Sequence, residues 1–406
     1  MRVLLTSWSW PTHYYWLMPM AWACRAAGHE VLVAVPPAGV AGAARAGLPV
    51  VPVGSDFDEL PVIAKYYWSS PIAEISARGG EVDWERMRAA GERPLSVYAL
   101  LSSFMQDDLL ALTRSWRPDV IVYDAVNYAA PLVAAACGVP AVRQIWGVDF
   151  SSRLAPFAPE ALARHRARLG LGEDEGDVLG ALTLDPCPPS MQLDDGIRRL
   201  PVRHPPYNGP GRAPRWLLER PRRPRVCVTW GTVSHLFGDR LFPLAGVLRA
   251  LSGLDVEVVA AVSPRDRAEL GPVPANTRVV ENLPLHLFLS GCDLVVSHGG
   301  GGVVGAAIDA GVPQLTVPRT SEQVLICRSL AGTGAGEMIA LDDASPALLR
   351  EQVVRLLGSA AHRDAARALR REARAQRPLS AAVADLEALA RARTAGGPMR
   401  GDAPCV

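Results

Sequence analysis

The chain has 406 residues, 49% hydrophobic and 20% charged, enough to bury the cores of about two ordinary domains. Its formal net charge of +1 at pH 7 provides no basic excess, which argues against a nucleic-acid binder. The seven cysteines are spread out without a CxxC pair, so we expect reduced thiols, no structural zinc site and a cytoplasmic protein. No apolar stretch reaches the ~18 residues of a membrane span, and we expect no membrane association.

Short apolar runs alternate with Ala- and Leu-rich stretches in both halves of the chain. This alternation predicts an α/β fold in which two Rossmann-like domains with parallel sheets face each other across a cleft. The expected strands are 3–7, 31–35, 50–53, 119–123 and 141–146 in the first half, and 225–230, 256–262, 277–280, 293–297 and 314–317 in the second.

A stretch rich in proline and glycine, 201–224, predicts the interdomain linker, because it favours neither a helix nor a central strand. We expect a first domain at 1–205, a linker at 206–220 and a second domain at 221–375. The terminal segment 376–406 is expected to form a helix at about 380–393 that packs back on the first domain, followed by a tail.

A faint internal repeat supports two copies of one plan. Asp119–Asp124 and Asp293–His298 each precede an Ala-rich stretch, a Gly-Val-Pro turn and an apolar run. Asp124 and His298 would therefore end equivalent strands. Ligands of such sheets bind beyond the carboxyl ends of the strands, so we expect the functional site between the domains.

The run His298-Gly299-Gly300-Gly301-Gly302-Val303 joins an expected strand to an expected helix. Glycine lets a ligand approach the backbone, and a helix N-terminus offers unpaired N–H groups and partial positive charge. The run predicts a phosphate or diphosphate cradle, with a simple tight turn as the alternative. Its GxGxxG pattern at Gly300, Gly302 and Gly305 is weak evidence for a dinucleotide site, because no acidic residue ends the next strand.

His13 follows the first expected strand and precedes a helix expected to begin near Leu17, with Pro19 in its first turn. In that position a histidine points into the cleft and can accept a proton near neutral pH. Asp124, at its own strand end, could bind the other ring nitrogen and fix the tautomer. Helix capping is the alternative for either residue.

Three further pairs are weaker candidates. Gly231-Thr232 follows a strand and predicts either a ligand-binding loop or a turn. Glu322-Gln323 begins a helix after Thr320-Ser321, where capping explains it almost as well as ligand binding. Asp194-Asp195 has no third carboxylate or histidine beside it, so we expect an exposed turn and not a metal site.

Together, motifs along nearly the whole chain resemble the inverting glycosyltransferases of the GT-B fold. More narrowly, they resemble bacterial antibiotic glycosyltransferases, in the UDP-glycosyltransferase-like family 1, that attach deoxysugars to polyketides and other natural products. The motifs are Thr12-His13, Pro19–Ala23, Arg25–Val31, Trp116–Asp119 with Asp124, Arg143–Asp149, Pro206–Gly211, Val228–Thr232, Leu283–Leu285, His298–Gly300 and Gly311–Leu315.

The resemblance implies that His13 is the catalytic base and Asp124 its orienting partner. It places the donor diphosphate at His298–Val303, the nucleobase against Leu283 and the sugar near Glu322-Gln323. It implies a nucleoside-diphosphate sugar, expected to be thymidine-linked, as donor, and neither a cofactor nor a metal. The chain departs from the family's usual hydroxyl residue at Val303 and from its usual aspartate at Glu322.

The acceptor and the partners are less defined. Tyr14, Trp16, Tyr67 and Phe104 suit a flat or macrocyclic apolar acceptor, or else belong to the core. The segment Arg143–Asp149 resembles the same segment of members that work with an inactive cytochrome-P450-like activator protein, so such a partner is a possibility. A homodimer is a second possibility. A nucleotide-sugar epimerase on the same fold, a dinucleotide-dependent oxidoreductase using Gly300–Gly305 and a non-catalytic carrier are the alternatives.

Overall fold

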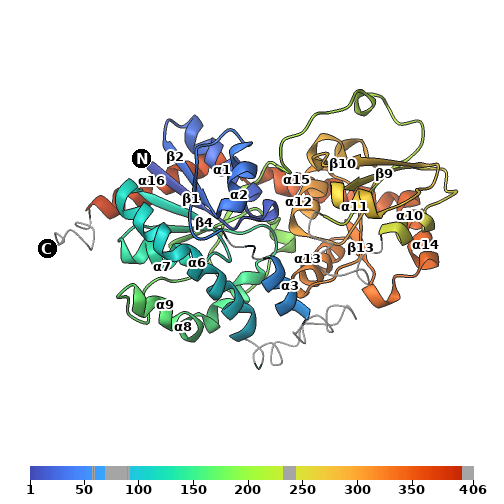
Figure 1. Ribbon diagram of the computed structural model, residues 1–406. Coiled ribbons are helices and arrows are strands. Elements are labelled where there is room, and N and C mark those ends of the chain that lie inside the picture. The colour runs from blue at the N-terminus through green and yellow to red at the C-terminus, as the bar shows by residue number, and fades with distance from the viewer. Residues whose placement is uncertain (57, 59, 69–88, 90–91, 232–243, 396–406) are drawn as a thin grey trace.

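The computed structural model describes residues 1–56, 58, 60–68, 89, 92–231 and 244–395, and places two α/β domains side by side (Figure 1). Both sheets are parallel throughout the described pairings. The predicted fold class is therefore confirmed.

The first domain contains an eight-stranded sheet and its covering helices. Its strands are β1 (Arg2–Thr6), β2 (Glu30–Val35), β3 (Val50–Pro52), β4 (Val120–Asp124), β5 (Ala141–Gln144), β6 (Leu182–Asp185), β7 (Leu200–Arg203) and β14 (Arg377–Pro378). Its helices are α1 (Pro11–Ala26), α2 (Pro37–Ala44), α3 (Leu60–Trp68), α6 (Glu92–Trp116), α7 (Ala129–Ala136), α8 (Ala158–Ala161), α9 (Ala163–Arg168) and α16 (Leu379–Ala395).

The second domain contains a six-stranded sheet. Its strands are β8 (Arg225–Thr229), β9 (Glu257–Val262), β10 (Thr277–Glu281), β11 (Leu294–Ser297), β12 (Gln314–Thr316) and β13 (Gly336–Met338). Its helices are α10 (Leu244–Ala250), α11 (Pro264–Glu269), α12 (Gly301–Ala310), α13 (Ser321–Gly332), α14 (Pro346–Gly358) and α15 (Ala360–Ala375).

The two sheets share one strand order. Strands β3-β2-β1-β4-β5-β6 of the first domain correspond to β10-β9-β8-β11-β12-β13 of the second. In each sheet the first three strands along the chain are added in one direction and the next three in the opposite direction, and ligands of open α/β sheets bind at such a switch point. The switch point lies at the carboxyl ends of β1 and β4 in the first domain and at those of β8 and β11 in the second.

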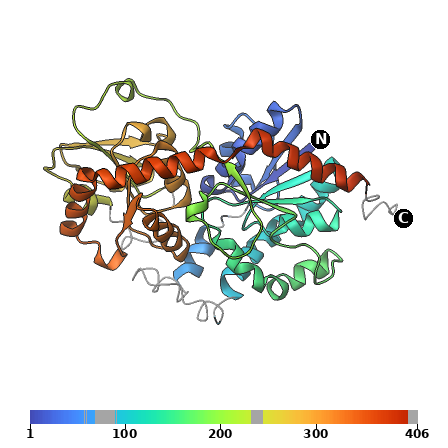
Figure 2. The same cartoon turned by 180° about the vertical axis from the view of Figure 1, so that it is seen from behind.

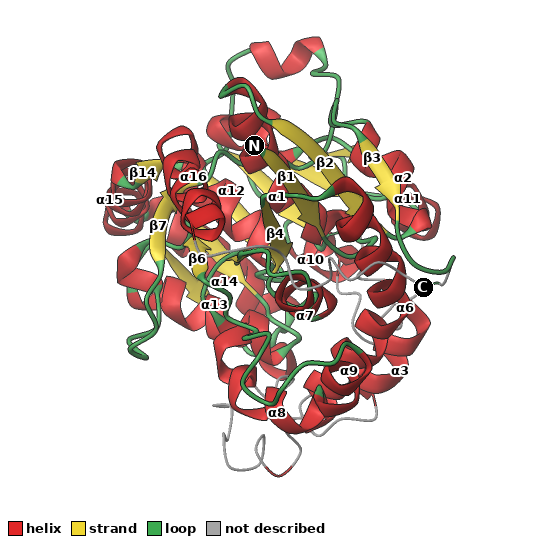
Figure 3. Ribbon diagram, turned by 90° about the vertical axis from the view of Figure 1, so that its left-hand side faces the viewer, coloured by secondary structure: helices red, strands yellow, loops and turns green. Residues whose placement is uncertain are grey.

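The central strands are apolar on both faces because helices cover both. Val3 and Leu5 of β1 pack in one cluster with α1 and α16, and Leu4 packs in another with α6 and α7. Figure 3 shows the strands lying between these helical layers. Two further clusters of buried residues fill the second domain on either side of its sheet.

The expectation that the stretch 201–224 forms no central strand was wrong at its start, while the linker bounds of 206–220 stay a prediction. Pro201 lies within β7, whose neighbours are β6 and the two-residue β14. Proline is tolerated here because the strand is short, close to the sheet edge and paired over only a few residues. Strands β6, β7, β13 and β14 were not predicted.

The end of the chain returns to the first domain. After α15 it forms β14 beside β7, and α16 then packs against α1 (Figure 2). Leu379, Val383 and Leu386 of α16 are buried in the same apolar cluster as β1. No helix in the described ranges is long and apolar enough to cross a membrane.

Candidate active site between the two domains

His13 lies in the first turn of α1, at the carboxyl end of β1. The helix begins at Pro11 and not near Leu17 as predicted, and Pro19 lies in its middle. Proline is favoured at a first helical position because its φ is preset and its missing N–H would have no helical acceptor. The His13 N–H donates to the Trp10 carbonyl at 3.0 Å, which fixes the start of this turn.

His13 and Asp124 form a close pair. Nδ1 of His13 lies 2.9 Å from Oδ2 of Asp124, a carboxylate that is only 2% exposed. The second carboxylate oxygen accepts the Val126 N–H at 3.2 Å, so the carboxylate is held from both sides. When Nδ1 carries the proton toward Asp124, Nε2 is the ring nitrogen that can accept one.

Trp146 lies against this pair and was not among the predicted site residues. Its ring meets the His13 ring edge-on, with centroids 4.9 Å apart and an interplanar angle of 67°. Its indole N–H donates to Oε1 of Glu322 at 2.5 Å. The only signal in the sequence was its place in the motif Arg143–Asp149, where it was the last residue of the predicted strand 141–146; the observed strand β5 ends earlier, at Gln144.

The loop that carries Trp146 is anchored by buried charges. Arg143 donates to both carboxylate oxygens of Asp149, at 2.6 and 3.2 Å, and their side chains are 1% and 0% exposed. Arg199 bonds Asp149 at 2.9 Å and Asp195 at 2.6 Å. Asp195 is therefore paired and largely buried, which corrects the prediction of an exposed turn for this residue, whereas Asp194 is exposed. Burial of Arg143 and Asp149 also removes both from any surface that a partner could contact.

The glycine run forms the start of α12. The N–H groups of Gly300, Gly301 and Gly302 have no acceptor among the described residues, as expected for a helix N-terminus. Val303 differs from the expectation: its N–H donates to the Gly300 carbonyl at 3.1 Å and its side chain is in the apolar core. The cradle therefore consists of the glycine N–H groups without Val303.

Three of the glycines are required by close packing. A Cβ at Gly299 would lie 2.0 Å from Sγ of Cys327, and one at Gly300 would lie 2.6 Å from Nε2 of His298. A Cβ at Gly301 would lie 2.7 Å from the Trp146 carbonyl oxygen. At Gly302, by contrast, a Cβ would meet nothing within 4 Å. Packing within the protein does not explain glycine at this position, whereas close approach of a ligand would.

His298 lies beside the glycine run without a positive charge. Burial, and second the nearby charge of Arg319, lower its pKa to about 3, so the ring is neutral near pH 7 and can still donate a hydrogen bond. Gly231 has a φ of +73°, and a Cβ there would lie 3.0 Å from the His298 ring. Gly231 thus leaves room for the ring, whereas Thr232 lies outside the described residues.

The residues expected near the donor sugar lie at the start of α13. Thr320 caps this helix by accepting the Gln323 N–H at 3.3 Å, and the Gln323 side-chain oxygen accepts the Arg319 N–H at 2.9 Å. Burial raises the pKa of Glu322, and the bond from Trp146 opposes that shift. Leu283 is a partly buried residue at the edge of the second domain's apolar cluster.

The residues expected to bind the acceptor lie in different environments. Tyr14 is 2% exposed and belongs to the first domain's core, which favours the core alternative for this residue over the acceptor site. Trp16 stacks on His204 with centroids 4.2 Å apart. Phe104 is 38% exposed on α6, and the side chain of Tyr67 lies outside what the structure describes.

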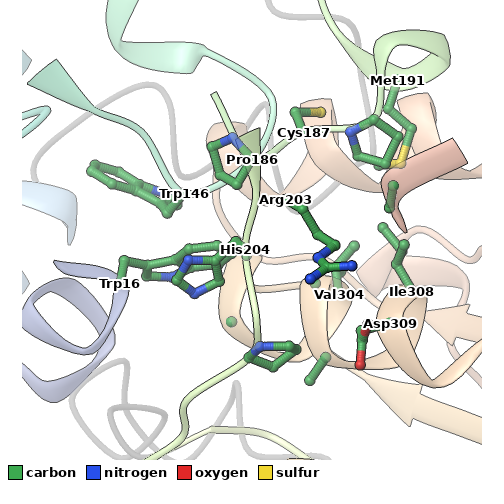
Figure 4. A pocket seen from close by; sticks show the side chains of 18 of the residues that line it. Trp16, Trp146, Pro186, Cys187, Met191, Arg203, His204, Val304, Ile308 and Asp309 are labelled. Atoms are coloured by element: carbon green, nitrogen blue, oxygen red, sulfur yellow. The ribbon is translucent and has the colours of Figure 1, made fainter. Parts of the chain in front are cut away.

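Trp16 and Trp146 line a pocket between the domains (Figure 4). Its wall continues through His204 and the start of α12 to Arg203 and Asp309. Burial lowers the pKa of His204 to about 3, so this wall is uncharged near the tryptophans. The free space is about 50 Å³, below the roughly 300–1,000 Å³ of typical ligand pockets. This pocket alone therefore does not house a large acceptor.

No group of three or more histidine, cysteine, aspartate or glutamate side chains in the described part of the chain is arranged to hold a metal ion.

The GxGxxG pattern at Gly300, Gly302 and Gly305 has a structural explanation. Gly305 lies within α12, where a Cβ would come 3.0 Å from the Trp16 ring. It permits the contact between α1 and α12, so the pattern does not need a dinucleotide.

Comparison with known proteins identifies the family. Residues 22–231 match the model of the erythromycin biosynthesis protein CIII-like N-terminal domain, and residues 245–389 match its C-terminal domain. The 10-deoxymethynolide desosaminyltransferase of Streptomyces venezuelae is 34% identical over 96% of this chain and 97% of its own length. The tylactone mycaminosyltransferase of Streptomyces fradiae is 36% identical over 96% of this chain and 92% of its own length.

A solved structure agrees with these relatives. Spinosyn rhamnosyltransferase SpnG superposes with a TM-score of 0.81 at 33% identity, covering 95% of this chain and all of its own. That enzyme has also been solved with thymidine diphosphate and with the spinosyn aglycone. None of these relatives supports the epimerase or oxidoreductase alternatives. The chain therefore belongs to the erythromycin biosynthesis protein CIII-like family and is a natural-product glycosyltransferase with the GT-B fold.

Proposed function

We propose that the protein transfers a deoxysugar from a thymidine-diphosphate donor to a hydroxyl group of a polyketide-type aglycone, with inversion at the anomeric carbon. The observation that carries the proposal is the position of the His13–Asp124 pair opposite the glycine start of α12. Trp146 touches both: it packs on His13, and its carbonyl and ring adjoin Gly301. A proton acceptor and an anion-binding helix N-terminus thus meet at the junction of the two domains.

The proposed reaction is a single displacement. Nε2 of His13 accepts the proton of the acceptor hydroxyl while that oxygen forms a bond to the anomeric carbon. The bond from the anomeric carbon to the diphosphate breaks, and the diphosphate leaves with the bonding electrons. The N–H groups of Gly300–Gly302 and the neutral His298 ring stabilise its charge. Asp124 keeps the His13 tautomer and stabilises the imidazolium that forms.

The same proposal assigns the remaining donor contacts. Leu283 packs on the nucleobase, Glu322 and Gln323 contact the sugar, and no metal ion takes part. Glu322 and Gln323 are followed by the buried, apolar Val324, so few groups here can form hydrogen bonds with additional sugar hydroxyls. A hydroxyl placed against apolar walls loses its water without replacement, which costs about 1–3 kcal/mol.

A panel of donors tests the assignment. We expect kcat/KM for a thymidine-diphosphate deoxysugar to exceed that for UDP-glucose by at least about tenfold, which corresponds to 1.4 kcal/mol. EDTA should leave the rate unchanged. Each donor is assayed with one accepted aglycone, with and without a cytochrome-P450-like activator protein, because Arg143–Asp149 resembles the segment of activator-dependent members. A preference for UDP-glucose under both conditions would contradict the deoxysugar assignment.

A further inference from the structure

Trp146 contacts three elements that belong to different parts of the site. Its ring packs edge-on against His13 of α1. Its carbonyl and Cδ1 leave no room for a Cβ at Gly301, the first residue of α12. Its indole N–H donates to Glu322 of α13, in the second domain. One side chain therefore links the residue proposed as base to both donor-side helices.

The first domain holds Trp146 firmly without help from the second. The buried Arg143–Asp149 pair closes the two ends of its loop. The Asp149 N–H also donates to the Gln192 side chain at 3.0 Å. Two buried charges with several hydrogen bonds define a single loop geometry. The indole N–H thus has a fixed direction, toward the second domain.

The length of residue 322 decides whether the link forms. The carboxylate of Glu322 reaches the indole N–H at 2.5 Å. An aspartate would end about 1.5 Å earlier, by the length of one carbon–carbon bond. Because its partners come from two domains, this bond is made only when the domains are as close as they are here.

We propose that Trp146 is a positioning residue that couples approach of the second domain to the orientation of His13. The Trp146–Glu322 bond fixes the indole when the domains meet, and the indole edge then holds the imidazole in line with Asp124. This inference rests on the proposed function, because it assigns Trp146 a part in that reaction. The proposal also gives a physical role to Glu322, which stands where the family usually has aspartate.

A double-mutant cycle with Trp146→Phe and Glu322→Asp tests the coupling. Phenylalanine keeps an aromatic edge beside His13 but has no N–H, and aspartate keeps the carboxyl group but is too short. We expect each single variant to lower kcat by about 10–100-fold through misplacement of the base. The double variant should be no slower than the slower single variant, because both changes remove one bond. Trp146→Phe should leave the affinity for thymidine diphosphate unchanged.

Trp22→Phe is the matched control. It removes an indole N–H that donates to the Ala46 carbonyl at 3.0 Å, within the first domain, and should leave kcat unchanged. Wild-type kcat in Trp146→Phe, or losses that multiply in the double variant, would overturn the proposal. The same cycle is measured by urea unfolding, where the two losses of stability should again not add. If the wild-type protein transfers no sugar from any donor, the proposed function fails, while the unfolding cycle still reports whether Trp146 and Glu322 are coupled.

Discussion

At the scale of single residues, the environment of each histidine decides what it can do. His13 has a buried carboxylate on Nδ1 and keeps 15% of its side chain exposed, so it combines an orienting partner with access from outside. His298 has no such partner, and burial lowers its pKa to about 3. The two rings therefore suit different tasks, proton acceptance for His13 and neutral hydrogen-bond donation for His298.

Replacing the His13–Asp124 pair separates chemistry from binding. We expect His13→Ala to reduce turnover by roughly 10²–10⁴-fold, the usual contribution of a general base, while calorimetry shows unchanged affinity for thymidine diphosphate. Asp124→Asn should reduce turnover less, since it disturbs the tautomer without removing the base. Wild-type turnover in His13→Ala with an accepted aglycone would mean that the residue only helps to begin α1.

At the scale of elements, the start of α12 offers a matched pair of substitutions. In Gly302→Ala the added Cβ has no atom within 4 Å in the free protein. Alanine is also more favourable than glycine in a helix by about 1 kcal/mol. We expect its stability to be unchanged or higher and its affinity for thymidine diphosphate to fall, because the methyl group occupies the anion's space. Isothermal titration calorimetry and urea unfolding measure the two effects.

Gly301→Ala is the comparison. Its Cβ would lie 2.7 Å from the Trp146 carbonyl, so we expect lower stability as well as weaker binding. If Gly302→Ala binds thymidine diphosphate as tightly as the wild-type protein does, the diphosphate is not held at this helix N-terminus.

The sequence was informative about elements with strong local patterns. The ten predicted strands occur within a few residues of their expected bounds, because most are buried, apolar runs; only β3 and β10, at the sheet edges, contain no fully buried residue. Strands β6, β7, β13 and β14 escaped prediction because they are short and hold their places through pairing with other strands. Whether Tyr14 lies in the core or in the acceptor site stayed open in the sequence for a related reason. Tyr14, Tyr15 and Trp16 are adjacent on α1, and only packing decides which of them faces inward.

At the scale of the whole molecule, the chain crosses between its domains more than once. It leaves the first domain after β7, builds the second, and returns through β14 and α16. The segment after β6 joins these crossings: Asp185 accepts the Cys187 N–H, and the Cys187 carbonyl accepts the Gln376 side-chain amide at 2.8 Å. This segment thus contains a carboxylate, that of Asp185, which the proposed chemistry does not use.

Asp185 should give the protein a pH-dependent stability. Burial raises its pKa from 3.8 to about 6, against the hydrogen bonds that it accepts from Cys187 and Gln192. Between these values the folded state binds more protons than the unfolded state, so the free energy of unfolding falls as pH rises from about 4 to about 6. A shift of about two pKa units corresponds to about 2–3 kcal/mol. His204 and His298, with lowered pKa values, contribute a slope of opposite sign.

Asp185→Asn isolates this contribution, because the histidine terms are common to both proteins and cancel in the difference. We expect the unfolding free energy of the variant, relative to wild type, to increase by about 2–3 kcal/mol between pH 4 and pH 7. Urea unfolding at closely spaced pH values measures the difference, and its slope matters more than its absolute value, since asparagine also changes the bond with Gln192. Two curves that stay parallel across this range would show that Asp185 is ionised in the folded protein as readily as in the unfolded chain.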